Sequence, residues 1–200
     1  MSRFRGIKIK TAQWIFILYC VMFFISFALC SASIAQENAA VREARIKTAV
    51  VYYLAKFITW PENTFQKSKR PLSVCTIGSK LILDFLEKTF DGKQVHNRSV
   101  KITRLMHEVK SPQLSSCDIV YLEEVSEQQT AGILKAITNL SILSISGQKD
   151  ITDVGGMVWL FKDKNRVRIK INPKVAEKAR LKVSSEILNI AEVVDDTDRE

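Results

Sequence analysis

The feature that most constrains the fold is an alternation of strand-like and helix-like segments between residues 72 and 146. Residues 72–77 alternate apolar with small or polar side chains in the period of a β-strand, whereas residues 80–90 carry apolar side chains on one helical face. Strands separated by amphipathic helices favour a parallel sheet. We therefore predict a single α/β domain whose mostly parallel sheet is covered by helices on both faces. The further segments of this pattern are strands at 100–105, 118–122 and 141–146 and a helix at 127–140.

Polar residues mark the expected beginnings of these helices. Ser79 is a candidate N-cap for residues 80–90, and Ser126 followed by Gln129 has the spacing of a capping box. Asn172 and Pro173 provide a cap and a first-turn proline for another short helix. The sequence thus predicts several short, capped helices.

Helices are also expected near both ends of the domain. The first covers residues 39–60, begins exposed, where Glu43 and Lys47 lie four positions apart, and stops at Pro61. The last covers residues 181–194, with Ser184 as a candidate N-cap.

Residues 157–161 and 166–171 predict an antiparallel hairpin near the C-terminus. Arg166, Arg168 and Lys170 alternate along its second strand, so their side chains project from one face. One interpretation is a solvated strand whose charges protect a sheet edge. The other is a docking surface for an acidic partner segment.

The N-terminus has the pattern of a secretory signal peptide. Basic residues precede an uncharged apolar run at 14–29, and small residues follow up to Ala35. The alternative is an uncleaved membrane anchor, although this run is shorter than the roughly 20 residues that usually span a bilayer. We predict cleavage after Ala35, one domain over 36–194 and a loose acidic tail at 195–200.

The charge of the chain must be judged after this cleavage. The formal net charge is +9 for the whole chain, and residues 1–35 contribute four basic and no acidic residues, which leaves +5. The remaining basic residues are scattered and do not alternate with aromatic ones, as a nucleic-acid groove requires. We expect no nucleic-acid partner.

Cys75 and Cys117 are the two cysteines left after cleavage. An even pair in an exported protein most simply forms a disulfide. A bridge between them closes a loop of 41 intervening residues, which the chain-entropy estimate values at about 4 kcal/mol. The alternative is two buried free thiols.

Enzymatic motifs are missing from the sequence. There is no nucleophile elbow, Walker A loop, zinc-protease helix or dinucleotide fingerprint. His96 and His107 do not have the spacing of metal ligands. We predict no enzymatic activity, no catalytic residues, no cofactor and no metal.

Gly78 and Ser79 form a weaker candidate site, because they lie where a strand passes into a helix. The free amides of a helix N-terminus can hold an anion. A tight turn followed by a cap explains the same two residues.

Several segments, in this order, resemble the YfiR family of bacterial periplasmic proteins. The resemblance covers roughly residues 40–194. The segments that carry it are residues 53–61, 71–78, 92–93, 117–122, 155–157, 166–172 and 181–185.

The resemblance implies an exported, non-enzymatic α/β protein that represses a membrane-bound diguanylate cyclase by contacting its periplasmic domain. It also implies a response to redox state and a homodimer. Cys75 and Cys117 match a family disulfide, whereas a second one found near Gly155 in some members has no counterpart here. Lys170 stands where many members have an acidic residue.

Two functions follow as hypotheses. The first is a periplasmic regulator that binds and inhibits the cyclase and so lowers cyclic-di-GMP signalling. The alternative is a periplasmic small-molecule-binding module whose ligand lies near the carboxyl ends of the parallel strands, around Gly78.

Overall fold

The computed structural model describes residues 39–65, 70–106 and 111–194. The chain divides into two compact units, residues 1–42 and 43–200. Only residues 39–42 of the first unit are described, and they are helical. The signal peptide expected at 1–35 and the tail expected at 195–200 lie outside the described residues, so both stay predictions.

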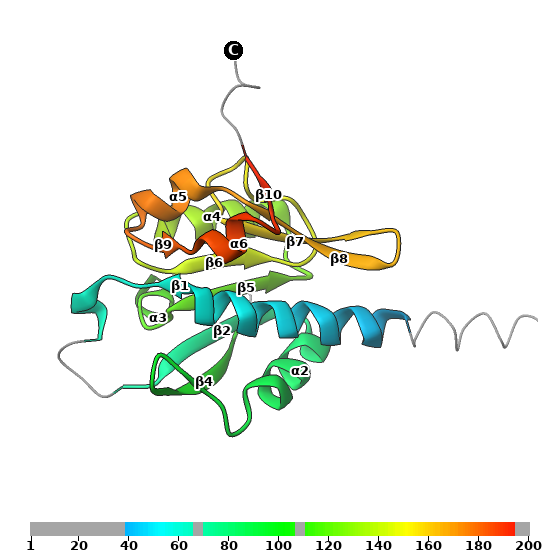
Figure 1. The fold of residues 1–200 in the computed structure, drawn as a ribbon, viewed down its shortest axis with the longest axis horizontal. Helices are drawn as coiled ribbons and strands as arrows, with labels where there is room; N and C mark the ends of the chain where they lie inside the picture. The colour runs from blue at the N-terminus through cyan, green and yellow to red at the C-terminus, as the bar shows by residue number, and fades with distance from the viewer. Residues whose placement is uncertain (1–38, 66–69, 107–110, 195–200) are drawn as a thin grey trace, which may run out of the picture. The chain divides into compact units, whose positions relative to one another are not determined.

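The second unit begins with helix 43–57 and then follows the expected alternation of strands and helices (Figure 1). The later elements are β1 (Ile58–Thr59), η1 (Glu62–Thr64), β2 (Leu72–Gly78), α2 (Lys80–Phe90), β3 (Gln94–Val95), β4 (Arg98–Leu105), α3 (Ser111–Leu114), β5 (Ile119–Glu123), α4 (Glu127–Ile137), β6 (Leu143–Ser146), β7 (Val158–Asp163), β8 (Arg166–Ile171), α5 (Pro173–Lys178), β9 (Lys182–Val183), α6 (Ser185–Leu188) and β10 (Glu192–Val193).

Eight of the strands form one sheet in the order β10-β8-β7-β6-β5-β2-β4-β3. The five neighbouring strands β4, β2, β5, β6 and β7 run parallel, whereas β8 is antiparallel to β7 and β3 is antiparallel to β4. The predicted α/β class, with a mostly parallel sheet and a C-terminal hairpin, is confirmed.

Helices pack against both faces of this sheet. One apolar cluster joins helix 43–57, α2, α5 and α6 to the strands, and a second joins α3 and α4 to them. Along β5, Ile119 and Tyr121 belong to the first cluster, while Val120 and Leu122 belong to the second. The side-chain period of two therefore buries this strand on both faces, as expected for a central parallel strand.

Two of the four predicted helix caps form the expected hydrogen bonds, whereas Ser184 occupies the N-cap position of α6 without a side-chain capping bond. Ser126 and Gln129 form the capping box of α4, and the Asn172 side chain accepts a hydrogen bond from the Val175 amide at the start of α5. Ser79 occupies the N-cap position of α2, but its side chain makes no capping hydrogen bond.

Both terminal helices are shorter than predicted. Helical residues end at 57 rather than 60, because Ile58 and Thr59 form β1 and pair with Val183 and Lys182 of β9. Residues 181–194 are not one helix, since the short α6 lies between β9 and β10. In both places pairing with a segment distant in sequence overrides the local helical pattern.

Candidate functional site

The predicted basic stripe lies on the face of the β7–β8 hairpin opposite to the one that packs into the first apolar cluster. The register places Lys170 opposite Trp159 and Arg168 opposite Phe161, so these cations share a face with two aromatic rings. The rings of Trp159 and Phe161 stack with centroids 4.5 Å apart, and both residues are partly exposed. Among the described residues, the apolar cluster beneath α3 and α4 includes none from β7 or β8. This end of the sheet face is therefore not covered by α3 or α4, but the loop that carries Asp150 and Asp153 lies against Lys170, and Trp159 Nε1 is buried.

The three cations of the stripe have different surroundings. Lys170 Nζ lies 2.7 Å from Asp150 Oδ2, and Arg168 Nη2 lies 3.3 Å from Glu192 Oε1. Arg166 is exposed beside the turn of the hairpin. Lys170 and Arg168 are thus paired with the protein's own carboxylates, whereas Arg166 lies opposite Asp163 in the register without an ion pair within 4.0 Å among the described residues.

The ion pair at the base shifts two pKa values. Burial raises the pKa of Asp150, but hydrogen bonds from Lys170 and Thr152 outweigh it and leave that pKa below its ordinary value. The hydrogen bond to Asp150 raises the pKa of Lys170. Both groups stay charged near neutral pH, which fixes the position of Lys170.

The aromatic pair was missed by the sequence analysis. Trp159 and Phe161 stand two positions apart in a strand that was correctly predicted, so they must share a face. Combining this spacing with the hairpin register would have placed them beside Arg168.

Gly78 and Ser79 lie where the carboxyl ends of β2 and β5 meet. A Cβ atom at Gly78 would come within 1.6 Å of the Glu123 carbonyl oxygen, and the backbone has φ +99°. The Ser79 amide donates to that same oxygen over 3.3 Å. Close approach of two backbones accounts for this glycine, and a ligand role for either residue stays a prediction.

A buried polar cluster fills the neighbouring end of the sheet. Lys47 Nζ contacts Glu43 Oε1 at 2.8 Å, Glu123 Oε1 at 3.0 Å and the Gly147 carbonyl at 2.5 Å. The Tyr121 hydroxyl donates to Glu123 Oε2 over 2.6 Å. Lys47 is 4% exposed, so the expectation that this helix begins exposed was wrong at this position.

Burial, followed by the charge of Glu123, raises the pKa of Tyr121 well above its ordinary value. The phenol therefore stays neutral and donates a hydrogen bond to the Glu123 carboxylate. This arrangement satisfies a tyrosine that is fully buried in the core.

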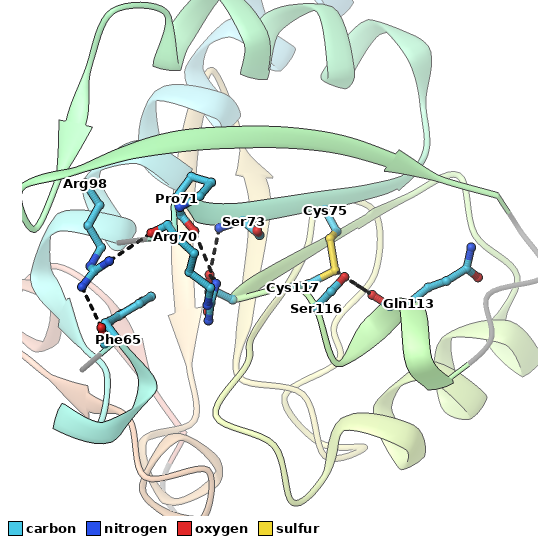
Figure 2. Close-up of polar contacts among 10 residues, drawn as sticks. Phe65, Arg70, Pro71, Ser73, Cys75, Arg98, Gln113, Ser116 and Cys117 are labelled. Carbon is cyan, nitrogen blue, oxygen red and sulfur yellow. Dashed lines mark hydrogen bonds and ion pairs between the residues drawn. A yellow bond between two sulfur atoms is a disulfide. The ribbon is translucent and has the colours of Figure 1, made fainter. Parts of the chain in front are cut away.

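Cys75 and Cys117 form a disulfide that joins β2 to the segment before β5 (Figure 2). The residues are 2% and 4% exposed and belong to the apolar cluster beneath α3 and α4. The bridge predicted from the sequence is present, and both sulfurs are shielded from solvent.

The residue after Cys117 anchors a second, polar connection at the same place. Asp118 is buried, accepts hydrogen bonds from both terminal nitrogens of Arg70 at 2.7 Å, and accepts one from the Ser73 amide at 2.8 Å. The guanidinium carbons of Arg70 and Arg98 lie 5.1 and 4.6 Å from the ring centroid of Phe65. Figure 2 shows this chain of contacts running from the disulfide toward Phe65. These contacts hold together the starts of β2 and β5, at the end of the sheet opposite to the Lys47 cluster.

A cavity of about 340 Å³ opens beside the start of α4. Val125, Ala131, Ile151 and Val154 provide its apolar walls, and Gln148 lies among them. The Gln148 side chain hydrogen-bonds both backbone groups of Val125, so its amide is already occupied. The cavity lies after β5 and β6, not at Gly78.

Within residues 39–65, 70–106 and 111–194, no three His, Cys, Asp or Glu side chains gather closely enough to hold a metal ion. His96 is exposed and its Nε2 lies 3.0 Å from the carbonyl oxygens of Ala55 and Ile58, while His107 lies outside the described residues. No helix in these ranges is long and apolar enough to cross a membrane.

Comparison with known proteins identifies the family. Residues 44–192 match the family model described as YfiR/HmsC-like. No curated protein matches the chain significantly. Among solved structures, the ABC domain in complex with L-Trp from Streptococcus pneumonia is similar with a TM-score of 0.45 and 9% identity, covering 62% of this chain and 55% of that one. The chain thus spans about half the length of that protein, and a likeness this weak carries no argument.

Proposed function

Because the chain belongs to the YfiR/HmsC-like family, we propose that it is a periplasmic regulator that binds and inhibits the periplasmic domain of an inner-membrane diguanylate cyclase. The family is a regulatory, non-catalytic one whose members act with membrane signalling partners. Inhibition of the cyclase lowers cyclic-di-GMP and, with it, biofilm formation. A homodimer of this chain is a second expected assembly.

The observation that carries the proposal is the hairpin face of Trp159, Phe161, Arg166 and Arg168, hereafter the aromatic–arginine face, in which both arginines are exposed and both rings are partly exposed. Tryptophan, phenylalanine and arginine are enriched at the centres of protein interfaces. Arg166 adds positive charge, which suits an acidic segment of the partner, whereas Arg168 is already paired with Glu192.

Inhibition needs no chemistry from this chain. A regulator that binds the inactive conformation of the cyclase more tightly than the active one shifts the equilibrium toward inactivity. The rigid sheet supports this role, since β7 and β8 are anchored by Leu160 and Ile171, both fully buried.

We further propose that partner binding responds to the redox state of the Cys75–Cys117 disulfide. Loss of the Cys75–Cys117 bridge loosens β2 and β5 and thereby weakens partner binding. Because both residues are buried, a reductant reaches the sulfurs only after local opening beneath α3. We therefore expect release under sustained stress rather than after a brief change in redox state.

A membrane pull-down tests the proposal most simply. The tagged chain should capture a diguanylate cyclase from membranes of the producing cell, and reductant should weaken the capture. A Phe161→Ala, Arg166→Glu double variant should lose it, while Lys101→Glu, at an exposed position on β4, should retain it. If the double variant captures the cyclase as well as the unchanged chain does, the aromatic–arginine face is not the binding surface.

The cavity beside α4 supports a second candidate function, binding of a small molecule in the periplasm. Its volume is in the range of ligand pockets, and its walls are mainly apolar. A thermal-shift screen of metabolites is the test. A shift abolished by Ala131→Leu, which fills the cavity, would favour this candidate, whereas no shift with any metabolite class would dismiss it.

A further inference from the structure

A second basic surface lies on the outer side of helix 43–57 and α2, which pack on the face of the sheet opposite to the aromatic–arginine face. The two helices run side by side in Figure 1, and the hydroxyls of Thr48 and Thr89 hydrogen-bond across them at 3.2 Å. Arg45 and Lys88 lie over the ring of Phe85, at 5.8 and 5.5 Å from its centroid.

A second aromatic ring flanked by two cations lies further along helix 43–57, at Tyr52. Lys56 and Lys93 lie 5.8 and 4.6 Å from the ring centroid of Tyr52. All four cations are exposed, both rings are partly exposed, and Leu81 beside them is 38% exposed. Arg45, Lys56, Lys88, Lys93, Tyr52, Phe85 and Leu81 are hereafter the helical basic face.

The charge of this face is not balanced locally. Among the described residues, no carboxylate lies within 4.0 Å of the charged nitrogens of these four cations, in contrast to Arg168 and Lys170 on the hairpin. Asp84 lies four positions before Lys88 and so shares its side of α2, but its carboxylate is paired with Lys80 Nζ at 2.9 Å. Glu87 lies on the side of α2 away from Phe85. An anionic partner is therefore favoured here by uncompensated charge.

We propose that the helical basic face lies against the surface of an anionic phospholipid bilayer. Lysine and arginine stems pack on apolar groups while their charged ends reach phosphate, and tyrosine favours the same interfacial depth. The charges are spread along two adjacent helices, and the cavity described above borders α4 instead. Charges spread over several elements in this way match a lipid surface better than a single acidic peptide. The proposal does not depend on the cyclase.

Vesicle sedimentation tests the proposal with the full chain as cells produce it. Binding to phosphatidylcholine vesicles containing 40 mol% phosphatidylglycerol should exceed binding to pure phosphatidylcholine and fall as salt is raised. A Lys56→Gln, Lys88→Gln, Lys93→Gln variant should bind the anionic vesicles about 100-fold more weakly, at roughly 1 kcal/mol for each basic residue near the surface.

The matched control removes the same charge from the hairpin, as Lys164→Gln, Arg166→Gln, Arg168→Gln, and should bind the anionic vesicles like the unchanged chain. Circular dichroism of all variants verifies their folding. Equal binding to both kinds of vesicle, or loss of binding in the hairpin control alone, would overturn the proposal. So would capture on immobilised polyglutamate without binding to the anionic vesicles, because the face would then recognise acidic protein.

Discussion

At the residue scale, the buried cluster around Lys47 determines which positions must stay small. A Cβ atom at Gly147 would come within 1.7 Å of Glu123 Oε2 and 2.0 Å of the Tyr121 hydroxyl. These atoms are held by Lys47 and by each other, so they cannot move without breaking buried hydrogen bonds. We expect Gly147→Ala to lower the free energy of unfolding by about 1–3 kcal/mol, measured by urea denaturation.

Gly132 is the matched control for this substitution. It lies inside α4, and a Cβ atom there has no neighbour within 4 Å. Gly132→Ala should raise the free energy of unfolding by up to about 1 kcal/mol, because alanine favours the helix. Equal destabilisation by both substitutions would show that the crowding at Gly147 is not the cause.

The pair of Asp150 and Lys170 predicts a dependence of stability on pH. The pKa of Asp150 is lowered by folding, so its contribution is present above the ordinary carboxyl pKa and is lost as the pH falls through the folded value. The destabilisation caused by Asp150→Asn should therefore be constant between about pH 6 and 8 and shrink below about pH 4. Urea denaturation across this range is the measurement, and a difference that grows toward low pH would contradict the assignment.

At the element scale, the disulfide fastens β2 to the start of β5. We expect a Cys75→Ala, Cys117→Ala variant to lose about 2–4 kcal/mol of unfolding free energy. The bridge is buried, so thiol labelling of the native protein in reductant should be much slower than labelling in urea. Rapid labelling of the folded protein would contradict the proposed need for local opening.

The elements that the sequence predicted well are those with a repeating pattern of their own. The apolar face of α2 and the reciprocal cap of Ser126 and Gln129 depend on residues close in sequence. By contrast, β1 and β10 depend on partners about 125 and 22 positions away. A two-residue strand has no periodicity, and only tertiary pairing distinguishes it from the end of a helix.

In the candidate site, too, the sequence predicted what depends on local periodicity and missed what depends on tertiary contacts. Alternation along the strand placed Arg166, Arg168 and Lys170 on one face, because a strand has a period of two. The acidic partners of Lys170 come from a loop whose position depends on the sheet order, so the sequence could not identify them. Lys47 was taken for an exposed residue for the same reason.

At the scale of the whole molecule, the two proposed surfaces have separate roles. The aromatic–arginine face lies on β7 and β8, whereas the helical basic face lies on helix 43–57 and α2, which pack on the opposite face of the sheet. Contact with the bilayer would hold the chain near an inner-membrane partner and raise its effective concentration.

The most direct test of the account is the cellular level of cyclic-di-GMP in a strain from which the gene is deleted. The level should rise on deletion and return to normal when the unchanged chain or Lys101→Glu is supplied. It should stay high when the Phe161→Ala, Arg166→Glu variant is supplied at equal abundance. An unchanged level after deletion would contradict the proposed inhibition of a diguanylate cyclase.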